Sequence, residues 1–130
     1  MQSSRWILAA GGLLLAAATV LGAFGAHALQ TRLPVERLQV YETAVRYQFY
    51  HALGVLTLGV VALTIDTTLI RWSAALLIAG ICIFSGSLYA LCFGAPRALG
   101  IVTPLGGLAL IAGWIVFVAG VLSYRPWRGP

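Results

Sequence analysis

The sequence predicts an all-α membrane protein, a left-handed bundle of four transmembrane helices with an interfacial helix leading into span two. Of the 130 residues, 61% are hydrophobic and only 8% are charged. Long apolar stretches follow one another, and small residues recur within them every seven positions. A water-soluble globule of this length needs far less apolar surface. We therefore expect one membrane domain, residues 1–130, with the lipid bilayer as its surroundings.

The first span is predicted at residues 6–29, which carry no charge apart from any on His27. A helix of this length extends over roughly 36 Å, enough to cross about 30 Å of hydrocarbon with some tilt. Arg5 and the small residues around His27 also resemble a secretory signal peptide. The apolar stretch is longer than a usual signal core, so a retained membrane helix is the preferred interpretation.

The segment 30–46 mixes polar and apolar residues, with Pro34 suited to a first helical turn. It predicts an interfacial helix that leads directly into span two at residues 47–65. Arg46 should lie at headgroup depth. Glu42, four residues before Arg46, has the favourable order for a helical ion pair.

Spans three and four are predicted at residues 72–93 and 99–124. A polar turn around Asp66 separates spans two and three, and the segment 94–97 (GAPR) interrupts the chain before span four. None of these connections has room for a soluble domain.

Small residues predict where the spans touch, because helices in lipid associate through small side chains and interhelical hydrogen bonds. A seven-residue repeat of such residues indicates a left-handed bundle with close crossings. Small on two sides, span one should have the most neighbours. The repeats are Gly11, Ala18 and Gly25, with Ala9, Ala16 and Ala23 on the opposite face, in span one; Ala52 and Gly59 in span two; Ser73, Gly80, Ser87 and Gly94 in span three; and Gly106, Gly113 and Gly120 in span four.

The basic residues number eight and are all arginine. Four spans place Arg5, Arg71, Arg125 and Arg128 on the side of the termini and Arg32, Arg37, Arg46 and Arg97 on the other. The count is equal, but nearby glutamates and the free amino terminus tip the positive charge toward the termini, so both termini are expected in the cytoplasm. Scattered arginines do not form the clustered footprint of nucleic-acid binding.

Polar side chains of the spans are predicted to converge in the leaflet opposite the termini. His27 ends span one and His51 lies about one turn into span two, so the two histidines should have similar depth. His27 follows the interface stripe of Ala16 and Ala23, and Gln48 precedes Ala52 and Gly59 along another. Such groups should point toward neighbouring helices, because lipid offers them no hydrogen-bond partner. The expected cluster comprises His27, Glu42, Gln48, His51, Ser85, Tyr89 and Thr103.

Four interpretations of this cluster are open: a hydrogen-bonded network that fixes helix register, a small-ligand or proton site, a metal or haem site, and a partner-binding surface. The network is preferred. His27, His51 and Glu42 lack dense metal-ligand spacing, and no haem-attachment motif occurs. No oxyanion-hole pattern accompanies Ser85 or Ser87. We therefore predict no metal, no cofactor and no catalytic residue.

Four segments carry a family resemblance: 22–29 (GAFGAHAL), 42–53 (ETAVRYQFYHAL), 84–89 (FSGSLY) and 103–107 (TPLGG). Their order and spacing resemble the small bacterial inner-membrane family called domain of unknown function 423. The resemblance covers nearly the whole chain and implies a four-span protein of the bacterial inner (plasma) membrane. It implies no activity, cofactor or catalytic residue.

Two functions follow as hypotheses. Four short-looped helices offer lateral faces but almost no soluble surface, so the leading hypothesis is a non-enzymatic accessory or regulatory component of a membrane assembly, with a membrane-protein partner or a second copy of the chain. The alternative is a small transporter or ligand-binding membrane protein that uses the polar cluster. A cavity reaching His51 would favour the alternative.

Overall fold

A computed structural model describes residues 2–125, and within this range all regular structure is helical. This confirms the predicted all-α class. Arg128, which entered the charge comparison, lies outside the described residues. The elements are α1 (Gln2–Phe24), which continues through a π-helical turn, η1 (Gly25–Leu29); α2 (Val35–Val61); α3 (Thr68–Cys92); a short 3₁₀ turn, η2 (Arg97–Ile101); and α4 (Thr103–Ser123).

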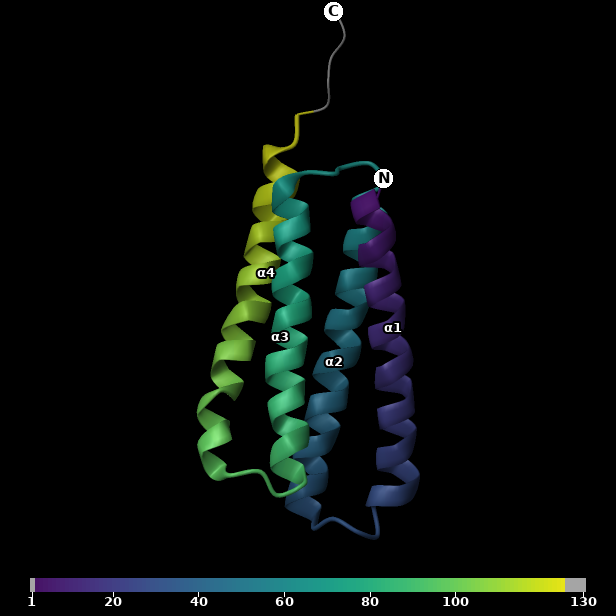
Figure 1. The fold of residues 1–130 in the computed structure, drawn as a ribbon, viewed down its shortest axis with the longest axis vertical. Coiled ribbons are helices and arrows are strands. Elements are labelled where there is room, and N and C mark those ends of the chain that lie inside the picture. The colour runs from purple at the N-terminus through teal and green to yellow at the C-terminus, as the bar shows by residue number, and fades with distance from the viewer. Residues whose placement is uncertain (1, 126–130) are drawn as a thin grey trace, which may run out of the picture.

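The helices alternate in direction and stand side by side in chain order, so that the start of α1 and the end of α4 lie at the same end of the molecule (Figure 1). α2 packs between α1 and α3, and α3 packs between α2 and α4. Within the described residues, α1 and α4 share no packed face. The arrangement is thus an open row rather than a closed bundle, and α1 is an edge helix that packs chiefly on α2 instead of the helix with the most neighbours.

Three helical stretches of the described chain are long and apolar enough to cross a membrane: Gln2–Leu29, Thr68–Cys92 and Arg97–Ser123. They correspond to predicted spans one, three and four. α2 has 27 residues and is long enough, but Arg46, Gln48 and His51 in its middle lower its hydropathy.

The predicted interfacial helix and span two form one continuous helix. Pro34 precedes its first residue with extended backbone angles, as expected of the residue before a helix starts. The first half of α2 packs along α1 through Tyr41 and Val45. The helix ends at Val61, four residues before the predicted end, because the chain turns at residues 62–64.

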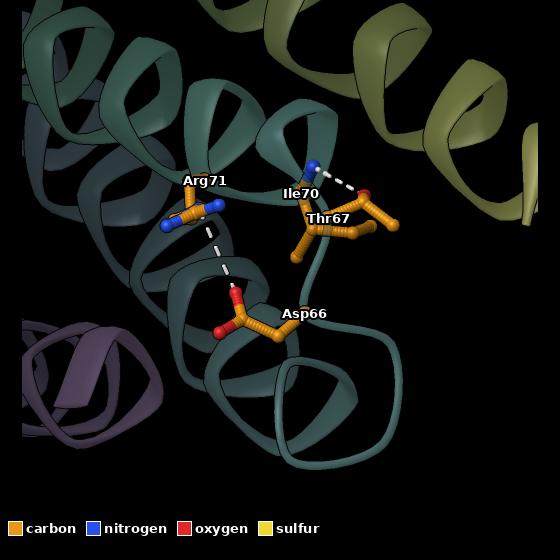
Figure 2. A network of polar contacts seen from close by, with 4 residues as sticks. All are labelled: Asp66, Thr67, Ile70 and Arg71. Carbon is orange, nitrogen blue, oxygen red and sulfur yellow. Dashed lines mark hydrogen bonds and ion pairs between the residues drawn. The ribbon is translucent and has the colours of Figure 1, made fainter. Parts of the chain in front are cut away.

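Polar contacts at the start of α3 hold the connection from α2 to α3 (Figure 2). The Thr67 hydroxyl oxygen accepts a hydrogen bond from the backbone N–H of Ile70 at 3.3 Å and caps the start of α3. The Arg71 guanidinium lies 3.6 Å from the Asp66 carboxylate. This cap explains why α3 begins at Thr68, one turn before the predicted boundary.

Close helix crossings confirm that most repeating small residues face neighbouring helices. A Cβ built on Gly11 would lie 2.7 Å from the backbone nitrogen of Leu56, so α1 and α2 touch backbone to backbone there. Gly106 meets the backbone of Phe84 in the same way between α4 and α3. At four further glycines a Cβ would lie within 2.8 Å of a side chain of the facing helix: Gly25, Gly59, Gly80 and Gly113.

The other small stripe of α1 has no such role. Ala9, Ala16 and Ala23 are exposed, because an edge helix in a row uses only one of its two sides. Gly94 is also exposed and has a positive φ of 95° in the turn after α3. A left-handed backbone is strained for other residues, so Gly94 serves the turn and not a crossing.

Two apolar clusters lie toward opposite ends of the row. The larger one, toward the termini, joins all four helices through residues such as Ile7, Leu58, Ile70 and Leu110. The smaller one, toward the α1–α2 connection, contains Leu29, Tyr41 and Cys92. The buried polar contacts of α2 with α3 lie between these clusters.

Candidate functional site

Gln48 joins three helices from the middle of the row. Its side chain is 5% exposed. The amide nitrogen donates to the backbone carbonyl of Leu14 in α1 at 3.1 Å, and the amide oxygen accepts from the Tyr89 hydroxyl in α3 at 2.9 Å. A side-chain amide has both a donor and an acceptor, so one residue of α2 binds both of its neighbours.

Tyr41 connects the same three helices, α1, α2 and α3, about two helical turns nearer the α1–α2 connection. It is 1% exposed, and its hydroxyl donates to the Leu21 carbonyl at 2.7 Å. The ring lies over Gly25, where a Cβ would come within 2.6 Å of it. It also contacts the Tyr89 ring, with centroids 5.2 Å apart. Gly25 opens the π-helical turn η1, and its missing side chain leaves room for the phenol.

Serine and threonine hydroxyls bind α3 to both of its neighbours, α2 and α4. Ser85 donates to the Ala44 carbonyl of α2 at 2.8 Å. The Ser87 and Thr103 hydroxyls lie 2.7 Å apart between α3 and the start of α4. Ser73 donates to the Gly113 carbonyl at 2.8 Å, in the half of the row nearer the termini. These bonds accompany the close crossings, because short side chains reach a neighbouring backbone only where the helices nearly touch.

His51 is half-buried and its ring is bound to its own helix. Nδ1 lies 2.7 Å from the Tyr47 carbonyl oxygen. Since a carbonyl only accepts, Nδ1 carries the proton of this bond. The ring stacks on Tyr47 at a centroid distance of 5.8 Å and approaches Trp114 of α4 at 6.3 Å. His51 therefore lies in an aromatic setting and, within residues 2–125, forms no hydrogen bond to the other members of the expected cluster.

His27 and Glu42 lie apart from the buried bonds, and both are exposed. Gly22 faces Val45 and Gly11 faces Leu56, so His51 lies level with the middle of α1. His27 is about ten residues further along α1, or roughly 15 Å at the helical rise. The equal depth expected for the two histidines is not found, and the structure brings together Gln48, Tyr89 and Ser85 without them.

The described residues leave no buried polar group of this region unpaired. Every buried side-chain nitrogen and oxygen among residues 2–125 has a hydrogen-bond partner. Within the same range, no three His, Cys, Asp or Glu side chains gather where they could hold a metal ion. The arrangement can hold four helices in one register, and unpaired polar groups in lipid would make other registers costly.

A groove of about 360 Å³ lies outside this interior, between the end of α1 and the first half of α2. Small residues of α1 form one side of it. Charged and aromatic residues of α2 form the other. Its lining comprises Gly22, Gly25, Ala26, Gln30, Tyr41, Glu42, Val45, Arg46, Phe49 and Tyr50.

Sequence reasoning missed three bridging residues. No bridging role was predicted for Tyr41, nor for the Cys92 thiol, which donates to the Arg37 carbonyl at 3.3 Å. Ser73 was expected only as a small residue. A signal for Tyr41 was present, since one face of α1 carries glycine at both ends of its repeat and leaves room for a large partner.

Three membrane-length apolar helices, with buried polar side chains bonded from helix to helix, define a multi-pass α-helical membrane protein. The comparisons with known proteins agree with this class. Residues 21–107 match the model of DUF423, a family of proteins of unknown function. The chain belongs to this family, as the resemblance implied.

Relatives of similar length are named as membrane proteins. The UPF0382 membrane protein SSP2132 of Staphylococcus saprophyticus is 43% identical over 117 residues, which cover 90% of this chain and 95% of that protein. The UPF0382 membrane protein YwdK of Bacillus subtilis is 44% identical over 108 residues, which cover 80% and 85%. No solved structure matches the chain.

Proposed function

We propose that this protein is a non-enzymatic accessory component of a membrane assembly, acting through its lateral helix faces. The proposal rests on one observation made on residues 2–125: the buried polar side chains are hydrogen-bonded, several of them from one helix to the next, while the small-residue face of α1 is exposed at the edge of the row. A locked interior suits a scaffold better than a transport path. Small side chains let a further helix approach closely.

The same proposal includes four membrane crossings. α2 is as long as its neighbours and lies between two helices that can each cross. Its amide and imidazole groups are bonded within the protein, which lowers the cost of placing them in lipid. We place the chain in the bacterial inner (plasma) membrane with both termini in the cytoplasm.

Reporter fusions test this topology. A fluorescent reporter at the C-terminus is expected to be active, and alkaline phosphatase at the same position inactive, because the latter functions only outside the cytoplasm. The matched control is a fusion after residue 95, between α3 and α4, where the outcomes should be reversed. Phosphatase activity at the C-terminus would show the inverted orientation.

Site-specific photo-crosslinking in cells tests the lateral partner. A crosslinking residue at Ala16, in the middle of the uncovered α1 face, is expected to give one protein adduct of defined mass. The same residue at Leu77, which is fully buried, should give none. An adduct at twice the monomer mass would identify a second copy, and a different mass another membrane protein. Absence of any protein adduct from Ala16 would contradict the proposed role.

A further inference from the structure

Two opposite charges line the groove between α1 and α2. Glu42 and Arg46 both line it and both are exposed. They stand one helical turn apart, in the order that favours an ion pair. Within the described residues, however, no ion pair joins them, and the expected pair is not formed. The groove therefore presents a free carboxylate and a free guanidinium about 5–6 Å apart at their Cβ atoms.

The depth of the groove follows from the contacts of α1. Val45 of the groove faces Gly22, and Tyr41 lies over Gly25, so the two charges lie level with the last turns of the apolar stretch Gln2–Leu29. This stretch has 28 residues and extends over roughly 42 Å, about 6 Å beyond each side of the hydrocarbon layer. Glu42 thus lies near the border between headgroups and acyl chains, and Arg46 lies about one helical turn deeper, from where its long side chain can extend back to the headgroups.

The two ends of the groove differ in polarity. Gln30 and Glu42 lie toward the α1–α2 connection, and Phe49 and Tyr50 lie on the side of the membrane interior. Gly22 leaves space beside the aromatic rings, since a Cβ there would have only Val45 within 4 Å, at 3.4 Å. A molecule with a charged headgroup and an apolar tail would fit this groove, with its headgroup at the polar end and its tail at the aromatic end.

We propose that the groove binds one phospholipid whose headgroup carries both a phosphate and a primary ammonium, that is, a phosphatidylethanolamine. Arg46 binds the phosphate, the Glu42 carboxylate accepts hydrogen bonds from the ammonium, and the start of an acyl chain lies along Gly22 and Phe49. The charges decide the headgroup. A purely anionic headgroup leaves Glu42 unpaired beside a phosphate, and a quaternary ammonium has no N–H to donate to it.

Native mass spectrometry of the detergent-purified full chain tests this assignment. The protein is mixed with equal amounts of phosphatidylethanolamine and phosphatidylglycerol that carry the same acyl chains. The wild type is expected to retain one phosphatidylethanolamine in clear preference. Arg46→Gln should lower retention of both lipids at least about tenfold, the ratio corresponding to one lost charge-assisted hydrogen bond. Glu42→Gln should abolish the preference while leaving phosphatidylglycerol binding intact or stronger.

Matched controls lie on the same helix. Glu36 and Arg37 are exposed and do not line the groove, so Glu36→Gln and Arg37→Gln should bind as the wild type does. Ala26→Trp fills the groove without removing a charge, and should also lose the lipid. Thermal melting of each variant shows whether it is folded. Equal retention of both lipids by the wild type, or an unchanged preference in folded Glu42→Gln, would overturn the assignment.

Discussion

Replacing Gly106 by alanine is expected to force α4 away from α3 and to lower the melting temperature of the detergent-solubilised protein. The added Cβ would lie 2.8 Å from the Cα of Phe84 and nearer still to its backbone nitrogen. A backbone cannot move aside as a flexible side chain can, so the helices themselves must separate. Overfilling of this kind costs about 1–3 kcal/mol, and separation also weakens the Ser87–Thr103 bond beside it.

The control is provided by two glycines that each follow a crossing glycine in the sequence, Gly107 after Gly106 and Gly12 after Gly11. Gly107→Ala places a methyl group 3.7 Å from the Phe84 ring, which is ordinary contact, and Gly12→Ala meets nothing within 4 Å. Both should melt at or slightly above the wild-type temperature, because alanine favours a helix over glycine. Gly11→Ala should behave as Gly106→Ala does. Equal melting of Gly106→Ala and Gly107→Ala would show that α3 and α4 do not approach so closely.

Gln48→Leu is expected to cause the other large loss of stability, because one substitution removes bonds to two helices. The Tyr89 hydroxyl loses its acceptor, and the link from α2 to Leu14 of α1 disappears. Unpaired groups of this kind cost about 1–3 kcal/mol in buried sites, although hydrogen bonds in membranes average about 0.6 kcal/mol. We expect a decrease near 1–2 kcal/mol in the free energy of unfolding, measured by denaturant titration in mixed micelles.

A double-mutant cycle assigns that decrease to the bond. Tyr89→Phe alone leaves the Gln48 oxygen without its donor and should destabilise less. The double variant Gln48→Leu, Tyr89→Phe should be more stable than the sum of the two single losses implies, since it leaves neither group of the pair unsatisfied. Strictly additive losses would mean that the bond between Gln48 and Tyr89 contributes nothing.

The fold class was predictable because long apolar stretches with small-residue repeats have few other solutions. The packing face of α2 was also readable, since Gln48, Ala52 and Gly59 are all buried as their shared stripe suggested. The open row of helices could not be predicted from the sequence. Hydropathy shows which residues avoid water, but lipid and a neighbouring helix are equally apolar, and only contacts between helices distinguish a row from a closed bundle.

The error at His27 has the same origin. Span one offers two small-residue stripes, and His27 was assigned to the one through Ala16 and Ala23. As an edge helix, α1 packs through the opposite stripe of Gly11 and Ala18, and His27 follows its own stripe to the surface. Gln48 and Tyr89 were grouped correctly, because both side chains face the contact between α2 and α3, where the Tyr89 hydroxyl donates to the Gln48 amide oxygen.

Packing in chain order also bears on how the molecule is made. Each helix rests mainly on the helix that precedes it, so most contacts join segments that are near one another in sequence. Such local contacts form quickly, and chains generally acquire structure from the N-terminus during synthesis. α1 and α2 can pair as a hairpin before α3 is complete, and α4 can then dock on an α3 already in place. A chain that ended at Phe93 would still contain every element that Gln48 holds together.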